Sequence, residues 1–336
     1  MKQKQPIQNQ LIDRFERRID YVRLSVTDRC DLRCVYCMSE KMTFLPRAQI
    51  LTLEEIEFIA SAFVELGVTK LRVTGGEPLV RHGVISLLEN LGKLPGLKEL
   101  VITTNATHLQ EMASAIHNAG VKRINISLDS LQHDRFRKIT RVGDLDQVLA
   151  GVDTACQQGF EKIKINAVIL KNRNHDEVCN LVDFAIDKNL DISFIEEMPL
   201  GIVDQHDRME AYYSSDMILA DLQPRFNLVQ STQSTGGPSV YYKAVGTATN
   251  IGFISPHSHN FCSTCNRVRL TVEGKLLLCL GNEHSVDLKQ VIRSNPGDIE
   301  TLKQAIIASL DIKPEKHEFD LSDQPVIFRH MSVTGG

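Results

Sequence analysis

Residues 22–37 read VRLSVTDRCDLRCVYC, a short β-rich run followed at once by three closely spaced cysteines. The cysteines, Cys30, Cys34 and Cys37, have the spacing C-x3-C-x2-C. Three thiolates can hold three corners of one metal centre and leave the fourth corner open, which is where chemistry can occur. A strand that ends in such a loop predicts a reactive group at the carboxyl edge of a parallel sheet.

The first two thirds of the chain alternate β-rich runs with segments of helical apolar spacing, a pattern typical of parallel βαβ units. Thr52 and Glu55 have capping-box spacing at the start of one such helix. Periodicity alone allows either an open doubly wound sheet or a curved, incomplete barrel. The expected helices are 53–66, 83–92, 109–118, 145–159 and 175–188, and the expected strands are Val22–Val26, Lys70–Val73, Glu99–Thr103, Lys122–Ser127, Lys162–Ile169 and Asp191–Glu196.

Polar or glycine-rich residues follow several of these strands. Gly75-Gly76-Glu77-Pro78 follows the second strand, Asn105 follows the third, and Ser127-Leu128-Asp129 closes the fourth. Because the carboxyl ends of parallel strands meet at one rim, we expect these groups to lie beside the first cysteine triplet.

A second cysteine triplet lies far downstream, in a region where the pattern changes after about residue 225. Cys262, Cys265 and Cys279 have the spacing C-x2-C-x13-C, among short strand-like runs at 240–245, 250–254, 267–272 and 275–279. With His257 and His259 just upstream, this spacing suits zinc and an iron–sulfur cluster about equally. Arg267 and Arg269 favour the iron–sulfur cluster, because guanidinium groups beside the metal suit an anionic substrate.

Composition limits the function classes. The chain has 336 residues, 42% of them hydrophobic, and a net charge of −4, which argues against a dedicated nucleic-acid binder. No apolar stretch approaches the length that spans a bilayer, and the polar N-terminus is not a secretory signal. We therefore expect a cytoplasmic protein, where clustered cysteines favour metal over disulfides. Cys156 and Cys179 are expected to be small buried residues of helices.

The first triplet resembles the defining motif of the radical S-adenosylmethionine (SAM) superfamily, including an aromatic residue, Tyr36, before the third cysteine. The resemblance implies a [4Fe-4S] cluster whose fourth iron binds SAM. The cofactor contacts that it implies are Tyr36, Gly76, Ser127 and Met198.

Nearly the whole chain is similar to one family of that superfamily, the GTP 3′,8-cyclases (molybdenum cofactor biosynthesis protein A family). Departures are small: Ser39 stands where proline is usual, and Glu16 where glycine is frequent. The similarity rests on Asp13-Arg14-Phe15, Arg23 to Cys30, Arg72 to Arg81, Asn125 to Asp129, Phe194 to Met198, Cys265 to Cys279 and the ending Gly335-Gly336.

The resemblance implies a fold with three parts. Residues 1–20 are an N-terminal extension, and 21–225 form an incomplete (βα)6 TIM-like barrel of parallel strands. Residues 226–336 form a smaller C-terminal α+β domain with a second [4Fe-4S] cluster and a Gly-Gly tail that reaches into the active site.

The implied activity is the radical cyclisation of GTP to 3′,8-cyclo-7,8-dihydro-GTP, the first step of molybdenum cofactor biosynthesis. The resemblance gives Arg23, Arg267 and Arg269 catalytic roles, and Lys70 is an additional candidate for substrate contact. It implies substrate contacts by Arg23, Arg72, Thr103, Lys164, Arg267, Val268 and Arg269, and cluster ligation by Cys30, Cys34, Cys37, Cys262, Cys265 and Cys279.

The implied partner is cyclic pyranopterin monophosphate synthase, which receives the product; no nucleic acid or membrane is expected. The sequence does not identify the electron donor, and a homodimer is one assembly that it allows. Two alternative functions remain open. One is a radical SAM enzyme that modifies a peptide and carries an auxiliary cluster. The other is a non-catalytic iron–sulfur or zinc-binding protein, for which SAM would not be cleaved under reducing conditions.

Overall fold

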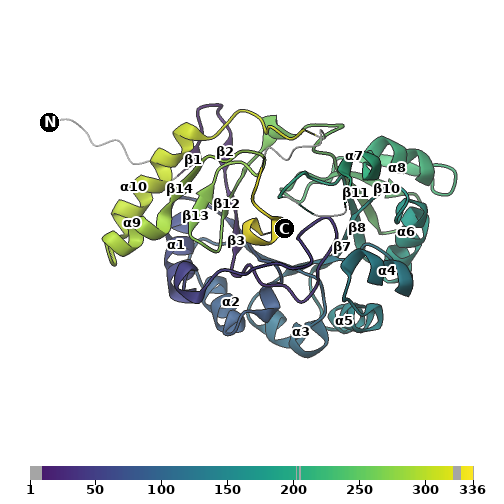
Figure 1. The fold of residues 1–336 in the computed structure, drawn as a ribbon, viewed down its shortest axis with the longest axis horizontal. Coiled ribbons are helices and arrows are strands. Elements are labelled where there is room, and N and C mark those ends of the chain that lie inside the picture. Colours follow the sequence, from purple (N-terminus) through teal and green to yellow (C-terminus); the bar gives the residue numbers. More distant parts are fainter. Residues whose placement is uncertain (1–9, 202, 204–205, 321–326, 336) are drawn as a thin grey trace.

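One curved sheet organises the chain, as the computed structural model shows for residues 10–201, 203, 206–320 and 327–335 (Figure 1). Its strand order is β14-β13-β12-β3-β4-β5-β6-β7-β8-β11-β10-β9. A separate hairpin, β1 (Leu11–Ile12) and β2 (Arg18–Ile19), precedes it. The sheet strands are β3 (Tyr21–Ser25), β4 (Lys70–Thr74), β5 (Glu99–Thr104), β6 (Arg123–Ser127), β7 (Lys162–Val168), β8 (Asp191–Ile195), β9 (Leu228–Ser231), β10 (Val240–Ala244), β11 (Asn250–Ile254), β12 (Arg267–Leu270), β13 (Lys275–Leu277) and β14 (Ser285–Asp287).

The strands β3 to β8 pair in parallel and in sequence order, so the incomplete barrel is confirmed. The C-terminal segments extend this parallel run at both edges, because β12 pairs in parallel with β3 and β11 pairs in parallel with β8. Antiparallel strands then complete each edge. Strands from before and after residue 225, the expected domain boundary, thus belong to one continuous sheet. The second triplet lies on an extension of the barrel wall.

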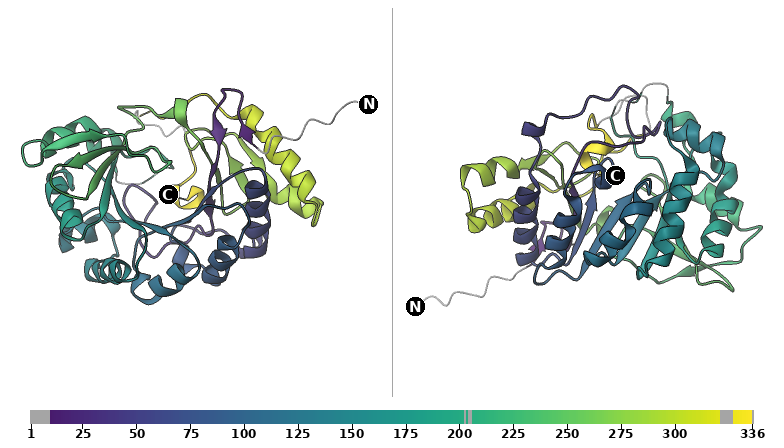
Figure 2. Two further views of the ribbon diagram at one scale, coloured as in Figure 1. Left: turned by 180° about the vertical axis from the view of Figure 1, so that it is seen from behind. Right: turned by 90° about the horizontal axis from the view of Figure 1, so that it is seen from below.

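Helices cover the outer side of the arc, while the described C-terminal residues lie in its hollow (Figures 1 and 2). Thr52 and Glu55 form the expected capping box at the start of α1. The sequence analysis did not predict α4 or the helices after β8. The helices are α1 (Leu53–Glu65), α2 (Val84–Gly92), α3 (Leu109–Asn118), α4 (His133–Thr140), α5 (Leu145–Gln157), α6 (Val178–Asp187), α7 (Arg208–Ala211), α8 (Ser215–Leu222), α9 (Leu288–Ser294), α10 (Ile299–Ser309) and α11 (Met331–Thr334).

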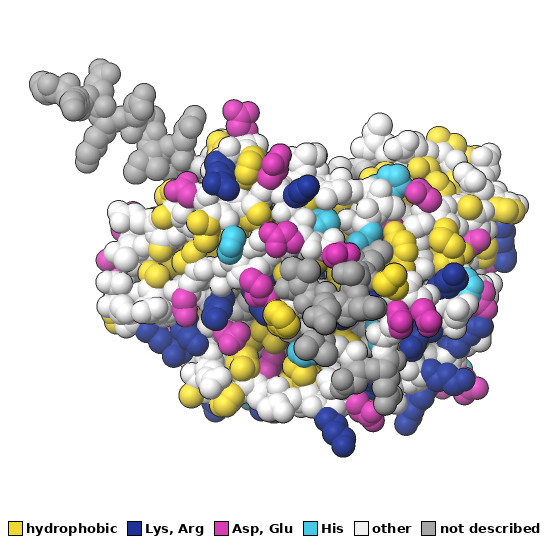
Figure 3. All heavy atoms as spheres, turned by 45° about the horizontal axis from the view of Figure 1, so that its top comes forward, with side chains coloured by type: hydrophobic (Ala, Val, Ile, Leu, Met, Phe, Trp, Pro, Cys, Tyr) yellow, Lys and Arg dark blue, Asp and Glu magenta, His cyan; other side chains and the backbone are white. Residues whose placement is uncertain are grey.

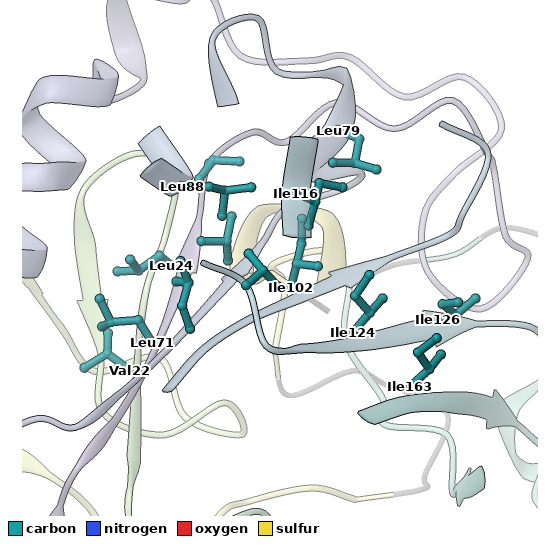
Figure 4. Packing of buried hydrophobic residues seen from close by; sticks show 14 of the residues in the cluster. Val22, Leu24, Leu71, Leu79, Leu88, Ile102, Ile116, Ile124, Ile126 and Ile163 are labelled. Carbon is teal, nitrogen blue, oxygen red and sulfur yellow. The ribbon is translucent and has the colours of Figure 1, made fainter. Parts of the chain in front are cut away.

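The core lies between the sheet and these helices, and strand alternation decides which residues join it (Figure 4). Val22 and Leu24 of β3 pack there with Leu88 of α2 and Ile116 of α3. Arg23 lies between the two β3 residues and therefore points to the opposite, concave face. Each fully buried aliphatic side chain contributes about 1.5–3 kcal/mol. The same alternation that builds the core therefore directs polar side chains inward.

Two further observations concern the sequence predictions. Cys156 is exposed, so its expected burial was wrong, and Cys179 is half-buried against the core. Cys156 is the last residue but one of α5. Its neighbour Ala155 is buried, but Cys156 itself lies on the side of the helix that faces solvent. Among the described residues, no helix is long and apolar enough to cross a membrane.

Candidate active site

The first cysteine triplet occupies the loop after β3. Cys30, Cys34 and Cys37 are all free thiols and line one cavity. Backbone hydrogen bonds attach the loop to the end of α4, from Arg33 N to Thr140 O at 3.0 Å and from Val35 N to Ile139 O at 2.9 Å. The loop is therefore ordered by the barrel around it.

Gly75 and Gly76 lie directly beneath this loop. A Cβ atom on Gly76 would be 2.4 Å from the carbonyl oxygen of Arg29, and one on Gly75 would be 2.7 Å from that of Thr27. Gly76 N donates to Thr27 O, and Glu77 N donates to Arg29 O, both at 2.8 Å. The glycines are thus required for close approach of two backbone segments, in addition to any contact of Gly76 with a ligand in the cavity that it lines.

Carboxyl groups surround the first triplet. The buried Glu77 side chain accepts hydrogen bonds from Leu79 N, Thr104 Oγ1 and Asn105 N, which joins the ends of β4 and β5. Burial raises the pKa of Glu77 to about 8. Burial likewise raises the pKa of the thiols, to about 12 for Cys37, and for Cys30 the neighbouring Glu77 adds to the effect.

The four positions predicted to contact SAM line the cavity of the first triplet. Tyr36, Gly76, Ser127 and Met198 come from the cysteine loop and from the ends of β4, β6 and β8. The Tyr36 hydroxyl donates to Asp129 Oδ2 at 2.7 Å, and Asp129 Oδ1 accepts from Val168 N. Burial raises the pKa of Asp129 to about 6. This bond joins the cysteine loop to β6 and β7.

The second triplet lines a second cavity. Cys262 lies in a 3-10 turn, and Cys265 and Cys279 flank the hairpin of β12 and β13. The two upstream histidines have other partners, since His257 Nε2 lies 2.9 Å from Glu197 O and His259 Nε2 pairs with Asp216 at 2.8 Å.

Each triplet brings three cysteines to one cavity, which is the number of thiolates that an iron–sulfur cluster with one open iron requires. Among the residues that the structure describes, no three His, Cys, Asp or Glu side chains are close enough to share one metal ion.

Cations surround the second triplet. Burial raises the pKa of Cys265, but Arg267, Lys313 and Arg17 together outweigh it and hold that pKa below its ordinary value. The positions predicted to bind substrate lie here as well. Arg23, Arg72, Thr103, Lys164, Arg267, Val268 and Arg269 line the same cavity, as does Lys70.

Sheet register explains how these cations meet. Arg23 of β3 lies between Arg72 of β4 and Arg269 of β12, each directly paired with it. Because facing residues of neighbouring strands point the same way, the three side chains share the concave face. Val268 belongs to the core cluster and points away, so it can reach a cavity ligand only through its backbone.

These cations are a feature of the interior. Arg72, Lys164 and Arg269 are buried, and burial lowers the pKa of Lys164 and lowers that of Arg269 to about 10. On the face drawn in Figure 3, by contrast, exposed charges of both signs are interspersed. A buried group of like charges indicates an anionic ligand.

Several cavity residues were missed by the sequence analysis. Tyr21, Asn125 and Asn166 line the second cavity, and the buried Oδ1 atoms of both asparagines have no hydrogen-bond partner among the described residues. Such acceptors suit a ligand with hydroxyl or amine donors. Asn125 stands in the quoted motif Asn125–Asp129, which was the available signal for it; Asn166, within β7, lies in no quoted motif.

The C-terminal tail enters the barrel. Met331 lines both cavities, Ser332 lines the first, and Gly335 O accepts a hydrogen bond from Arg269 Nη1. Gly336, the second glycine of the expected ending, lies outside the described residues.

The two cavities share part of their walls. Thr103, Asn166, Ile195, Met198 and Met331 line both of them. The two cysteine triplets therefore open onto adjoining spaces inside one barrel.

Two family models together match most of the chain. The Radical SAM superfamily model matches residues 24–185, and the Molybdenum Cofactor Synthesis C model matches residues 190–319. A protein of Pseudomonas putida (strain W619) named GTP 3′,8-cyclase is 58% identical over 327 residues, covering 97% of this chain and 98% of the relative. A protein of the same name from Ectopseudomonas mendocina is 57% identical, covering 98% and 99%.

Solved structures match at the level of the fold. Streptococcus suis SuiB bound to S-adenosylmethionine has a TM-score of 0.64 at 16% identity, covering 94% of this chain and 77% of that one. SuiB bound to its precursor peptide SuiA has a TM-score of 0.59 at 18% identity, with coverages of 94% and 76%.

Proposed function

The chain belongs to the GTP 3′,8-cyclase family and is a radical SAM enzyme, and we propose that its two cavities divide the cyclisation of GTP between them. SAM binds beside Cys30, Cys34 and Cys37, and GTP binds beside Cys262, Cys265 and Cys279. The observation that carries this division is the wall that the two cavities share. A radical formed in one cavity can meet a substrate in the other without crossing solvent.

Each triplet would supply three ligands for a [4Fe-4S] cluster. When bound, the first cluster and SAM would supply the radical chemistry that removes hydrogen from C3′ of the GTP ribose. The residues around the first cavity orient SAM. Tyr36 is fixed by its bond to Asp129, and Ser127 and Met198 border the cavity at two strand ends.

The cations of the second cavity hold the triphosphate. Arg23, Arg72 and Arg269 lie side by side on neighbouring strands, so they can contact several phosphate oxygens at once. Arg267 and Lys164 add charge from two further positions. Each charge-assisted hydrogen bond contributes about 1.5–3 kcal/mol.

Position accounts for the selectivity of the reaction. The ribose must present one C–H bond among several, and C8 of guanine must lie within reach of the C3′ radical. Asn125 and Asn166 offer buried acceptors for the sugar hydroxyls or the guanine amine. When the protein holds C3′ of the ribose and C8 of guanine close together in one fixed geometry, the bond between them can form without a further conformational search. The product is 3′,8-cyclo-7,8-dihydro-GTP.

The cellular context belongs to the proposal as well. The chain acts in the cytoplasm and passes its product to cyclic pyranopterin monophosphate synthase. Within the chain, residues 21–225 form the radical-generating part, and residues 226–336 carry the second cluster. The match of the C-terminal half to a molybdenum cofactor synthesis model supports this pathway.

The test is anaerobic reconstitution with iron and sulfide, followed by dithionite, SAM and GTP. We expect 5′-deoxyadenosine and 3′,8-cyclo-7,8-dihydro-GTP to form together, in a ratio near one to one, by chromatography with mass detection. ATP in place of GTP is the matched control. Formation of 5′-deoxyadenosine at the same rate with and without GTP, and without the cyclised product, would contradict the proposal.

A further inference from the structure

Lys313 is a buried cation beside the second triplet, and neither the sequence motifs nor the catalytic proposal uses it. It follows the turn Leu310–Ile312 and is only 1% exposed. Lysine is almost never fully buried unless a partner compensates its charge. The partners of its ammonium group therefore need an explanation.

Lys313 Nζ contacts the two chain segments that carry cysteine ligands. It donates to Arg267 O at 3.2 Å, two residues after Cys265, and to Leu278 O, directly before Cys279. It also lies 3.8 Å from the sulfur of Cys265. One ammonium group thus touches the sulfur of Cys265. It also joins the first residue of β12 to the residue that follows β13.

The described residues offer this ammonium group no carboxylate partner. Among the described residues, no Asp or Glu lies within ion-pair distance of Lys313, while Arg267 and Arg269 add positive charge to the same region. Two neutral carbonyl oxygens do not balance a buried ammonium. Cys265, whose sulfur lies 3.8 Å from this ammonium group, can become an anion as a thiolate.

Arg17 is a second buried cation beside the same triplet and offers a comparison with Lys313. Its guanidinium donates to Cys262 O at 2.9 Å and to Pro314 O at 2.7 Å, so it ties the residue after Lys313 to the first cysteine. Unlike Lys313, Arg17 has a carboxylate partner, because its Nε lies 2.6 Å from Asp13 Oδ2. The charge of Arg17 is balanced by this carboxylate, and no described residue gives Lys313 a carboxylate of that kind.

We propose that Lys313 is the charge-compensating residue of the second iron–sulfur cluster, and that it favours the reduced state of that cluster. This inference rests on the proposed two-cluster function. Three thiolates on an oxidised cluster leave one net negative charge, and reduction adds one electron and no proton, so the negative charge doubles. A cation in contact with a ligand sulfur stabilises the reduced state more than the oxidised one.

The experiment is a potentiometric titration of the reconstituted full-length enzyme, with dithionite as the reductant and electron paramagnetic resonance as the readout. A variant with alanine at Cys30, Cys34 and Cys37 identifies the signal of the second cluster. Lys313→Met removes the ammonium, and Lys313→Gln removes its charge but keeps a hydrogen-bond donor. Lys289→Met is the control, since the ammonium group of this half-buried lysine of α9 donates to a backbone carbonyl, Gln49 O, and contacts no cysteine of either triplet among the described residues.

We expect both Lys313 variants to keep the iron content of the parent. At a fixed solution potential, their ratio of reduced to oxidised second cluster should fall about tenfold or more, equivalent to about 59 mV for one electron. The first cluster and the Lys289→Met enzyme should titrate as the parent does.

Three outcomes would contradict the account. The first concerns the two-cluster function, and the other two concern the role of Lys313. A parent enzyme with iron for only one cluster contradicts the two-cluster function itself. An unchanged second-cluster potential in Lys313→Gln, with the cluster present, overturns the inference alone. Loss of the second cluster from both variants also overturns it, because Lys313 would then hold the cluster in place without tuning it.

Discussion

The two cysteine triplets present the same three ligands in opposite electrostatic surroundings. Glu77 and Asp129 lie around the first triplet, where burial and these carboxyl groups raise the pKa values of Cys30 and Cys34. Around the second, guanidinium and ammonium groups lower the pKa of Cys265. Ligand type and number therefore do not decide what each centre does.

The ways in which the triplets are built differ as well. The first lies within one loop that two glycines hold against the neighbouring strand, so its geometry is local. The second is assembled from a turn and both sides of a hairpin at the edge of the sheet. A local loop suits a centre whose geometry must be constant, and an assembled one places many cations around a large anion.

The largest effect that can separate the two centres is expected from Gly76→Ala. The new Cβ would lie 2.4 Å from Arg29 O, so the cysteine loop must move. We expect iron to fall to the content of one cluster and SAM cleavage to fall at least a hundredfold, measured as 5′-deoxyadenosine. Gly237→Ala is the control, because the nearest atom to its added Cβ is 3.7 Å away. Normal SAM cleavage by Gly76→Ala would refute the close-packing argument.

The cations of the second cavity predict the next largest effect. Arg72→Met removes a guanidinium that donates to Thr103 Oγ1 at 2.8 Å and to the Tyr21 hydroxyl. Losing about 1.5–3 kcal/mol should weaken GTP binding roughly 10- to 150-fold. Equilibrium dialysis with labelled GTP measures this, with Arg293→Met, a surface arginine paired with Glu55, as the control. SAM affinity should stay within twofold, and an equal loss for both ligands would count against two separate sites.

Tyr21 provides a smaller, pH-dependent test of the cationic surroundings. Burial raises the pKa of its phenol, but four cations outweigh burial and bring it to about 7; they are Arg72, Arg23, Lys70 and Arg267. Between pH 7 and about 10, the folded phenol has lost its proton while the unfolded one keeps it, so Tyr21 increases stability as pH rises through that window. Below pH 7 this contribution is absent.

Ultraviolet difference absorbance should show one tyrosinate forming near pH 7 in the ligand-free enzyme and none in Tyr21→Phe. Bound GTP neutralises the same cations, so saturating GTP should move this titration to higher pH. If the pH of this titration were the same with and without GTP, the placement of Tyr21 in the substrate cavity would be contradicted.

The smallest effect is expected for Cys156→Ser. This cysteine is exposed and belongs to neither triplet. Iron content should be unchanged, and stability in urea should change by less than about 0.5 kcal/mol. Loss of iron would mean that a seventh cysteine takes part in cluster binding.

Local signals made much of this molecule predictable. The strands from β3 to β8 and both triplets follow from runs of a few residues, because periodicity and spacing are local properties. The pairing of β12 with β3 was not predictable, since it joins residues about 250 positions apart and leaves no pattern in either segment.

The burial of individual side chains was the other property that the sequence did not reveal. Lys313 and Asn166 look like ordinary polar residues in the sequence, and only the fold encloses them. Cys156 was misjudged for the converse reason, since apolar spacing shows that a helix has a buried face but does not show where that face ends.

The division of labour between the triplets is tested most directly by comparing Cys34→Ser with Cys262→Ser under identical reconstitution. For each variant, labelled-GTP binding and 5′-deoxyadenosine formation are measured in parallel. We predict that Cys34→Ser binds GTP but forms no 5′-deoxyadenosine, and that Cys262→Ser still cleaves SAM slowly but loses GTP binding and the cyclised product. Cyclisation of GTP at the parent rate by Cys262→Ser would contradict the account.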